Sequence, residues 1–166
     1  MEKKLTLLVL AYLAALAISA AAQQRFPPPT TSGGSGEALL NLDNTVAVHG
    51  YDPTAYFTEK RAIKGNKRIY ERLGSATYYF ASRANRYEFL GNAPQYQPQL
   101  GGFCVTSMSM GRLEDINPHL FALYNGKLYL FNNPEAQAIF WANPERTIHE
   151  ATAHYFELAK QKRERW

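Results

Sequence analysis

Cys104 is the only cysteine in the chain, so no disulfide can form within one molecule. The fold must therefore depend on a hydrophobic core. The thiol itself is a buried core group, a reactive group, a metal ligand or an attachment point for another chain. Residues 99–104 read Gln-Leu-Gly-Gly-Phe-Cys, which places two glycines and an aromatic ring next to the sulfur in the sequence.

The first 22 residues have the pattern of a secretory signal peptide. A charged start at residues 1–4 precedes an apolar run over residues 5–18, and small residues lead to Gln23. The apolar run is shorter than the roughly 20 residues that a membrane-spanning helix needs. The sequence therefore predicts cleavage near Ala22, export to the periplasm or the extracellular space, and no membrane span after cleavage.

The rest of the chain predicts one small domain behind a linker. Residues 23–43 include a stretch rich in Pro, Thr, Ser and Gly and predict a disordered linker. Residues 44–160 predict a domain large enough for a single core, and residues 161–166 predict a basic tail. The net charge of the whole chain is only +4, which argues against nucleic acid as a partner of an exported protein.

Hairpins alternate with helices along the predicted domain. Asp52 and Ser82 are suited to cap helical segments, and Asn125-Gly126 is a strong turn signal. The order predicts an α+β domain with a small antiparallel sheet of hairpins packed against helices. The expected elements are a strand at 45–48, a helical turn at 53–57, a hairpin at 67–73 and 76–80, a helix at 83–90, an extended segment at 101–111, a hairpin at 120–124 and 127–131, and helices at 134–142 and from 144 onward.

Spacing also predicts which faces are buried. Tyr87, Phe89 and Leu90 are expected to form the buried side of the helix at 83–90. The last helix is expected to bury one face at helical spacing, formed by Ile148, Ala151, Tyr155 and Leu158.

Four motifs occur in one order: Val-His-Gly-Tyr-Asp-Pro-Thr-Ala-Tyr-Phe at 48–57, Ala-Thr-Tyr-Tyr-Phe-Ala-Ser at 76–82, Gly-Gly-Phe-Cys at 101–104, and Asn-Gly-Lys-Leu-Tyr-Leu at 125–130. Together they resemble the YHS-domain family, in particular its exported single-domain branch with GYDPVAYF-like and GGYC-like motifs. The resemblance covers about residues 46–159. It implies a metal-binding function, with copper as one proposed metal. Where cysteine-bearing members have Phe-Cys-Ser, this chain has Phe80-Ala81-Ser82, so that family thiolate is absent.

A metal site would have to use Cys104 with imidazole partners. His49 is the candidate partner, because a soft sulfur with imidazole suits copper and both groups also bind zinc. His149 and His154 are five residues apart, whereas two ligands on one helical face need a spacing of four. These two histidines are therefore expected at the surface. His119 is also expected there, because it follows Pro118 where a loop enters a strand.

A small-ligand site beside Cys104 is the other form of the binding hypothesis. Its candidate residues are Tyr51, Asp52, Tyr79, Ser82 and Phe103. The aromatic rings are alternatively ordinary core residues, and Asp52 is alternatively a helix cap. Gly101-Gly102 predicts that a strand or a ligand comes close to the backbone there.

Three functional hypotheses follow. The first is a non-catalytic binder of copper, zinc or a small ligand near Cys104. The second is a thiol-dependent enzyme that uses Cys104, with His49 as its base. The third is a structural or partner-binding module with an inert buried cysteine. The sequence does not identify a protein partner.

Overall fold

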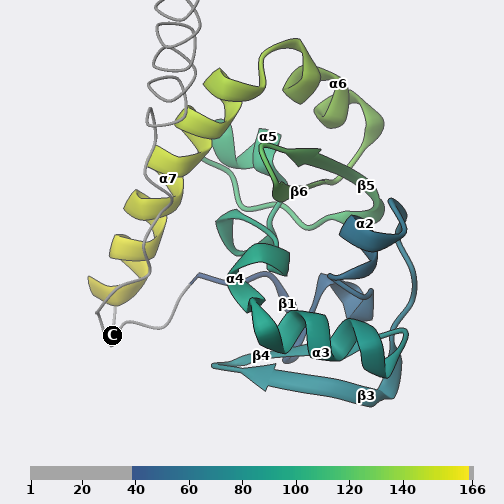
Figure 1. Cartoon of the computed structure of the whole chain (residues 1–166). Helices are drawn as coiled ribbons and strands as arrows, with labels where there is room; N and C mark the ends of the chain where they lie inside the picture. The colour runs from purple at the N-terminus through teal and green to yellow at the C-terminus, as the bar shows by residue number, and fades with distance from the viewer. Residues whose placement is uncertain (1–38, 165–166) are drawn as a thin grey trace, which may run out of the picture. The chain divides into compact units, whose positions relative to one another are not determined.

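The computed structural model describes residues 39–164 of the chain. The predicted signal peptide and residues 23–38 of the predicted linker lie outside the described residues. The described part combines helices with two separate sheets (Figure 1), so the predicted α+β class is confirmed. Within residues 39–164, no helix is both long and apolar enough to cross a bilayer.

The larger sheet has four strands in the order β1-β2-β4-β3, and the smaller one is the hairpin β5–β6. β2 runs parallel to β4, and Thr77 N donates to Thr45 O at 2.7 Å beside this pair. The prediction of a single antiparallel sheet is therefore wrong in this detail, because a distant short strand pairs with the first hairpin. The strands are β1 Leu42–Asp43, β2 Val46–Ala47, β3 Asn66–Leu73, β4 Ala76–Phe80, β5 Asn117–Tyr124 and β6 Lys127–Phe131.

Two of the helices begin at the caps that the sequence predicts. Ser82 Oγ accepts from Asn85 N at 3.1 Å, and Asn133 Oδ1 accepts from Ala136 N at 2.8 Å. The α-helices of the described residues are α2 Ala55–Thr58, α3 Arg83–Gly91, α4 Ala93–Tyr96, α5 Val105–Ser109, α6 Pro134–Ala142 and α7 Pro144–Glu164. α7 thus continues through most of the segment predicted to be a basic tail.

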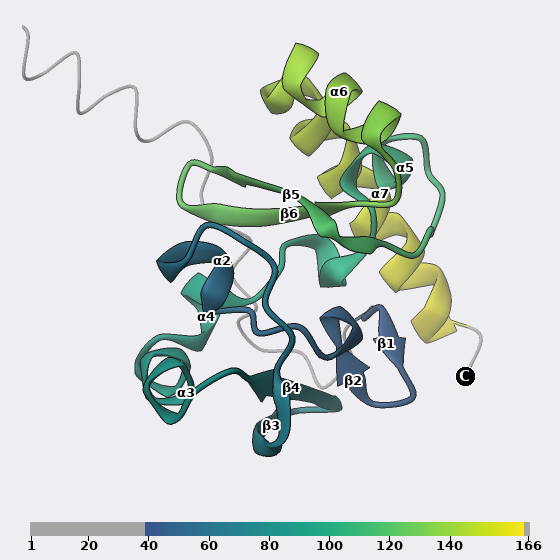
Figure 2. The same cartoon turned by 90° about the vertical axis from the view of Figure 1, so that its right-hand side faces the viewer.

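The segment predicted to be extended, residues 101–111, contains the short helix α5 instead. Met108 N donates to Cys104 O at 2.9 Å, which closes the first turn. α5 lies beside α7 in both views and against α6 and β6 (Figures 1 and 2). Met108 is buried and Met110 is 50% exposed. The amphipathic pattern was too short to reveal a helix whose stability comes from these neighbours.

Two short turns have three consecutive residues with positive φ. In η1, Val48–Gly50, φ is 52° at Val48, 50° at His49 and 75° at Gly50. In η2, Leu100–Gly102, the values are 53°, 67° and 80°. Left-handed backbone costs an L-residue roughly 1–2 kcal/mol, so Val48, His49 and Leu100 are held there by surrounding contacts.

Gly101 is required by the chain's own N-terminal segment. A side-chain carbon at Gly101 would lie 2.0 Å from Leu39 O, and Asn41 N donates to Gly101 O at 2.9 Å. The close backbone approach that the glycines predict is therefore made by residues 39–41. Leu39 is buried and β1 begins at Leu42, so the folded part starts before the predicted boundary at Asn44.

One hydrophobic core joins the elements. Phe140 on α6 is fully buried in it, with its ring 5.2 Å from that of Phe131 and 5.5 Å from that of Tyr129. On α7, Ala151 is buried, and the other residues of the predicted face pack against the core as partly buried side chains, namely Ile148, Tyr155 and Leu158.

α3 covers the β3–β4 hairpin with fewer buried residues than the sequence predicts. Phe89 is buried and its ring contacts those of Tyr78 and Phe80. Tyr87 is 67% exposed and Leu90 is 48% exposed, so the expectation that both are buried is wrong. α3 packs on the hairpin through Phe89 and Arg86, and Tyr87 lies beside an open space.

Candidate functional site

Cys104 is a core residue in the structure. It is fully buried, immediately before α5, and it forms an isolated parallel bridge with Leu130 on β6. Its thiol donates a hydrogen bond of 3.3 Å to Asn132 Oδ1. A thiol that donates its proton to an amide oxygen is in its neutral form, whereas nucleophiles and metal ligands are thiolates.

A polar network surrounds Asn132 and fixes the loop after α5. Asn132 Nδ2 donates to Glu114 Oε2, and Ser107 Oγ donates to the same oxygen at 2.7 Å. Arg112 Nε donates to Glu114 Oε1 at 3.0 Å. The hydrogen bond from Ser107, with further contributions from Arg112, lowers the pKa of the Glu114 carboxyl against a smaller opposing effect of burial. Asn132, which accepts from the Cys104 thiol, is thus held by a hydrogen-bond network that stabilises the fold.

His49 lies in a different environment from Cys104. Its Nε2 is 2.8 Å from Asp115 Oδ1, and its backbone oxygen accepts from Lys64 Nζ at 2.7 Å. Within residues 39–164, no three His, Cys, Asp or Glu side chains are grouped so that they could hold a metal ion. Among these residues, the structure therefore shows no third metal ligand beside the predicted pair of Cys104 and His49.

Asp52 has the cap role that was the alternative to a ligand contact. The residue is fully buried, and its Oδ1 accepts from Thr54 N at 2.8 Å and from Ala55 N at 3.3 Å. Its Oδ2 accepts from Ala81 N at 2.8 Å and from Asn85 Nδ2 at 2.7 Å. One carboxylate therefore joins the start of α2 to the junction between β4 and α3.

Tyr51 forms part of a surface cluster with histidine and lysine. Its hydroxyl lies 3.1 Å from His119 Nε2, and Lys64 Nζ lies 4.6 Å from the centre of its ring. His119 is exposed, as the sequence predicts. Lys64 also contacts His49 O, so these side chains join the η1 turn to the start of β5. None of these three side chains lines the groove between β3 and α3.

The other predicted ligand residues have structural contacts in different places. The Tyr79 ring lies 3.0 Å from the position of a side-chain carbon at Gly50, so it packs on that turn. Ser82 caps α3, and Phe103 packs against the core beside Cys104. His149 and His154 are exposed on α7, as predicted.

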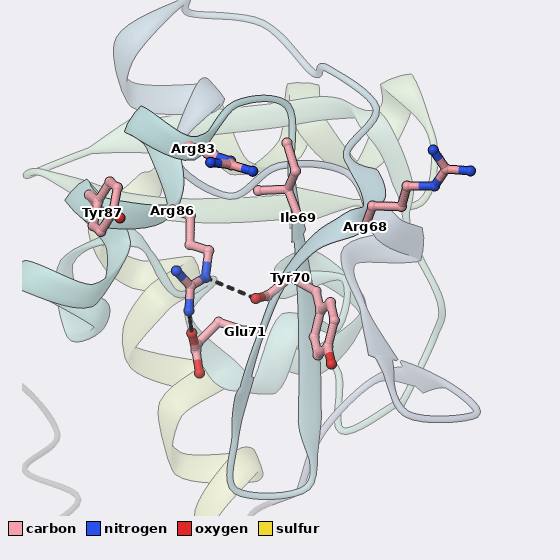
Figure 3. A pocket seen from close by; sticks show the side chains of 7 residues that line it. All are labelled: Arg68, Ile69, Tyr70, Glu71, Arg83, Arg86 and Tyr87. Atoms are coloured by element: carbon pink, nitrogen blue, oxygen red, sulfur yellow. Dashed lines mark hydrogen bonds and ion pairs between the residues drawn. The ribbon is translucent and has the colours of Figure 1, made fainter.

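An open groove of about 650 Å³ lies between β3 and α3. Figure 3 shows Arg83 extending from α3 toward Ile69 on β3, with the guanidinium of Arg86 between Arg83 and Glu71. Arg86 Nη2 donates to Glu71 Oε2 at 2.6 Å, and Arg86 Nε donates to Tyr70 O at 3.0 Å. The complete lining is Arg68, Ile69, Tyr70, Glu71, Arg83, Arg86 and Tyr87.

The groove depends on an irregularity in β3. Asn66 pairs with Phe80 and Tyr70 with Tyr79, so residues 67–69 bulge out of the ladder. Asn66 Oδ1 accepts from Arg68 N at 2.9 Å and stabilises the bulge. Bulges on edge strands often redirect side chains beside functional sites. The signal for this groove in the sequence is the concentration of arginine and tyrosine in residues 68–72 and 83–87, which belongs to none of the four motifs.

The groove is a polar site of the size that small ligands occupy. Its surface can bind and orient a ligand through arginine donors and tyrosine rings. No family model, curated protein or solved structure matches the chain.

Proposed function

We propose that the protein is an exported YHS-type domain that binds a small ligand without catalysing a reaction. In this proposal the ligand binds in the groove between β3 and α3, and Cys104 is a structural residue of the core. The observation that carries it is the open space of about 650 Å³ between two elements that hold exposed arginine and tyrosine side chains.

Three features support binding in place of catalysis. The groove contains no cysteine, histidine, serine or lysine, which are common nucleophiles and proton-transfer groups. Its only carboxylate, Glu71, is held by Arg86 at 2.6 Å. Cys104 is fully buried, and its thiol donates to Asn132, which is unfavourable for attack on a substrate.

The test is a screen of chemically diverse small molecules against the isotope-labelled protein, with binding located by backbone NMR shifts. Hits should shift the amides of residues 68–71 and 83–87. Tyr87→Ala should weaken these hits, whereas Phe156→Ala removes another exposed ring, on α7, and should not. If the hits instead shift amides around Leu130 and Asn132, the ligand site lies beside Cys104 and the groove proposal is wrong.

A second measurement distinguishes a metal site at Cys104 and His49 from a small-ligand site in the groove. Copper or zinc bound by Cys104 should raise the melting temperature, and Cys104→Ser should abolish that rise. We expect no rise that depends on Cys104. A rise that is lost in both Cys104→Ser and His49→Ala would establish the metal site and overturn the proposal.

A further inference from the structure

We propose that the ligand of this groove is a small oxyanion, a phosphate or a carboxylate, attached to a flat apolar group. The inference rests on the proposed function, because it assigns a ligand chemistry to the same groove. It is argued from the charge of β3 and α3, from the unused donors of two arginines, and from the exposed rings at the groove.

Positive charge is concentrated on the two elements that form the groove. β3 and α3 together hold five basic and two acidic residues, an excess of three, whereas the whole chain has a net charge of only +4. The basic residues are Lys67, Arg68, Arg72, Arg83 and Arg86. The lining of the groove itself contains three arginines and one glutamate, and such an excess of positive charge attracts anionic ligands.

Arg83 and Arg86 have donors available for an anion. Among residues 39–164, the Arg83 guanidinium has no hydrogen-bond or ion-pair partner, and Figure 3 shows it extended into the groove. Arg86 uses Nε and Nη2 for Tyr70 O and Glu71, which leaves Nη1. The contacts to β3 hold Arg86 in place, so its remaining donor is already oriented. Two guanidinium groups facing one space suit the paired oxygens of a carboxylate or phosphate.

The first turn of α3 gives an independent reason to expect an anion in the groove. Arg83 is the first residue of α3, Arg86 lies in the same turn, and this turn has no acidic residue. Positive side chains at the N-terminus of a helix are unfavourable, because the helix dipole is positive at that end. Local rules are broken in this way mainly at functional sites. An anion between Arg83 and Arg86 would offset the repulsion, whereas a neutral ligand would not.

The apolar part of the ligand is inferred mainly from one exposed ring. Tyr87 on α3 is 67% exposed and lies beside Arg86, whereas the ring of Tyr70 points away from Arg86 (Figure 3). Ile69 adds an aliphatic side chain between the strand and the helix. A tyrosine ring offers a flat apolar face together with a hydroxyl group, so it favours a flat group that is linked to an oxyanion.

The experiment compares four probes by NMR titration of the full chain: phenyl phosphate, benzoate, inorganic phosphate and neutral benzyl alcohol. We expect phenyl phosphate or benzoate to shift the amides of residues 68–71 and 83–87, to bind more tightly than the other two probes, and to weaken with added salt. Arg83→Gln should weaken binding about tenfold, the loss expected for one hydrogen bond to a charged group.

Arg61→Gln is the matched control, because it removes one exposed positive charge outside the groove. The affinity of the Arg61→Gln variant for the charged probes should stay within about twofold of that of the unaltered protein. Arg83→Lys keeps the charge but loses the guanidinium fork, and it should retain an intermediate affinity.

Three outcomes would overturn the inference. If benzyl alcohol binds in the groove as tightly as the charged probes, the oxyanion assignment fails while the groove remains the ligand site. If Arg61→Gln weakens the charged probes as much as Arg83→Gln, the attraction is only a general effect of net charge. If neither these probes nor the wider screen perturb the groove, the proposed function fails as well.

Discussion

The thiol of Cys104 donates a hydrogen bond of 3.3 Å to the side-chain oxygen of Asn132, and the sulfur has no exposure to solvent. Asn132 in turn donates to Glu114 and Ser107, so a chain of hydrogen bonds passes from the core to the loop after α5. This contact makes the single cysteine a part of the core.

The burial of Cys104 predicts that its thiol reacts only after the protein opens. Alkylation of the native protein should be slower than alkylation in denaturant by about 1,000-fold or more, because opening a core segment costs several kcal/mol. The rate should be measured against denaturant concentration, with Cys104→Ser as the blank. A native rate equal to that of a free thiol would contradict the burial of Cys104 and support the enzyme hypothesis.

Asp52 should be essential for stability. Asp52→Asn removes the charge and places amide hydrogens against donors, so the four hydrogen bonds of the carboxylate cannot all persist. Unfolding in urea should show a loss of about 3 kcal/mol, since hydrogen bonds to a buried charged group are costly to break. The control Asp43→Asn changes an exposed residue and should cost less than about 0.5 kcal/mol.

A smaller effect at Asp52 would show that this carboxylate does not join α2 to the β4–α3 junction in solution. Asn85→Ala provides a second measurement, because it removes only the 2.7 Å bond to Oδ2. Its cost should be lower than that of Asp52→Asn.

Alkaline pH should destabilise the protein through Tyr129. Burial, with a smaller contribution from Tyr124, raises the pKa of the Tyr129 hydroxyl from 10.0 to about 12. The neutral phenol is therefore favoured in the folded state, so its contribution is complete below about pH 10 and is lost as the pH rises toward 12. At pH 11 the loss should be about 1 kcal/mol.

Urea unfolding between pH 9 and pH 11.5 measures the slope of the free energy of unfolding against pH. Tyr129→Phe should reduce it, and Tyr87→Phe, at an exposed ring, should leave it unchanged. The pKa values of the buried Tyr56 and Tyr78 hydroxyls are also raised by burial, so a slope remains in Tyr129→Phe. An identical slope in Tyr129→Phe and the unaltered protein would contradict the prediction.

Local signals predicted the elements that depend on local chemistry. The hairpin at Asn125-Gly126 forms, with φ values of 49° and 69° that an Asn-Gly turn tolerates. Ser82 and Asn133 cap their helices through side-chain oxygens that reach the backbone three residues later. These features require only neighbouring residues.

The errors arise where distant contacts outweigh local preference. Cys104 precedes a helix because α5 packs between α6, α7 and β6. Residues 42–43 form a strand because β1 pairs with β2, and Leu39 is buried because Gly101 lets its backbone approach. Tyr87 was expected in the core, but α3 meets the hairpin mainly through Phe89.

The sequence by itself determined that the chain has one cysteine, that no internal disulfide can form, and that hairpins alternate with capped helices. Only the tertiary structure decided that Cys104 is buried in the core and that Arg83 and Arg86 of α3 meet Ile69 and Glu71 of β3 at one groove (Figure 3). The reason is physical: capping and turn formation act over three or four residues. Burial and the meeting of charges instead depend on how a bulged edge strand and a helix pack together.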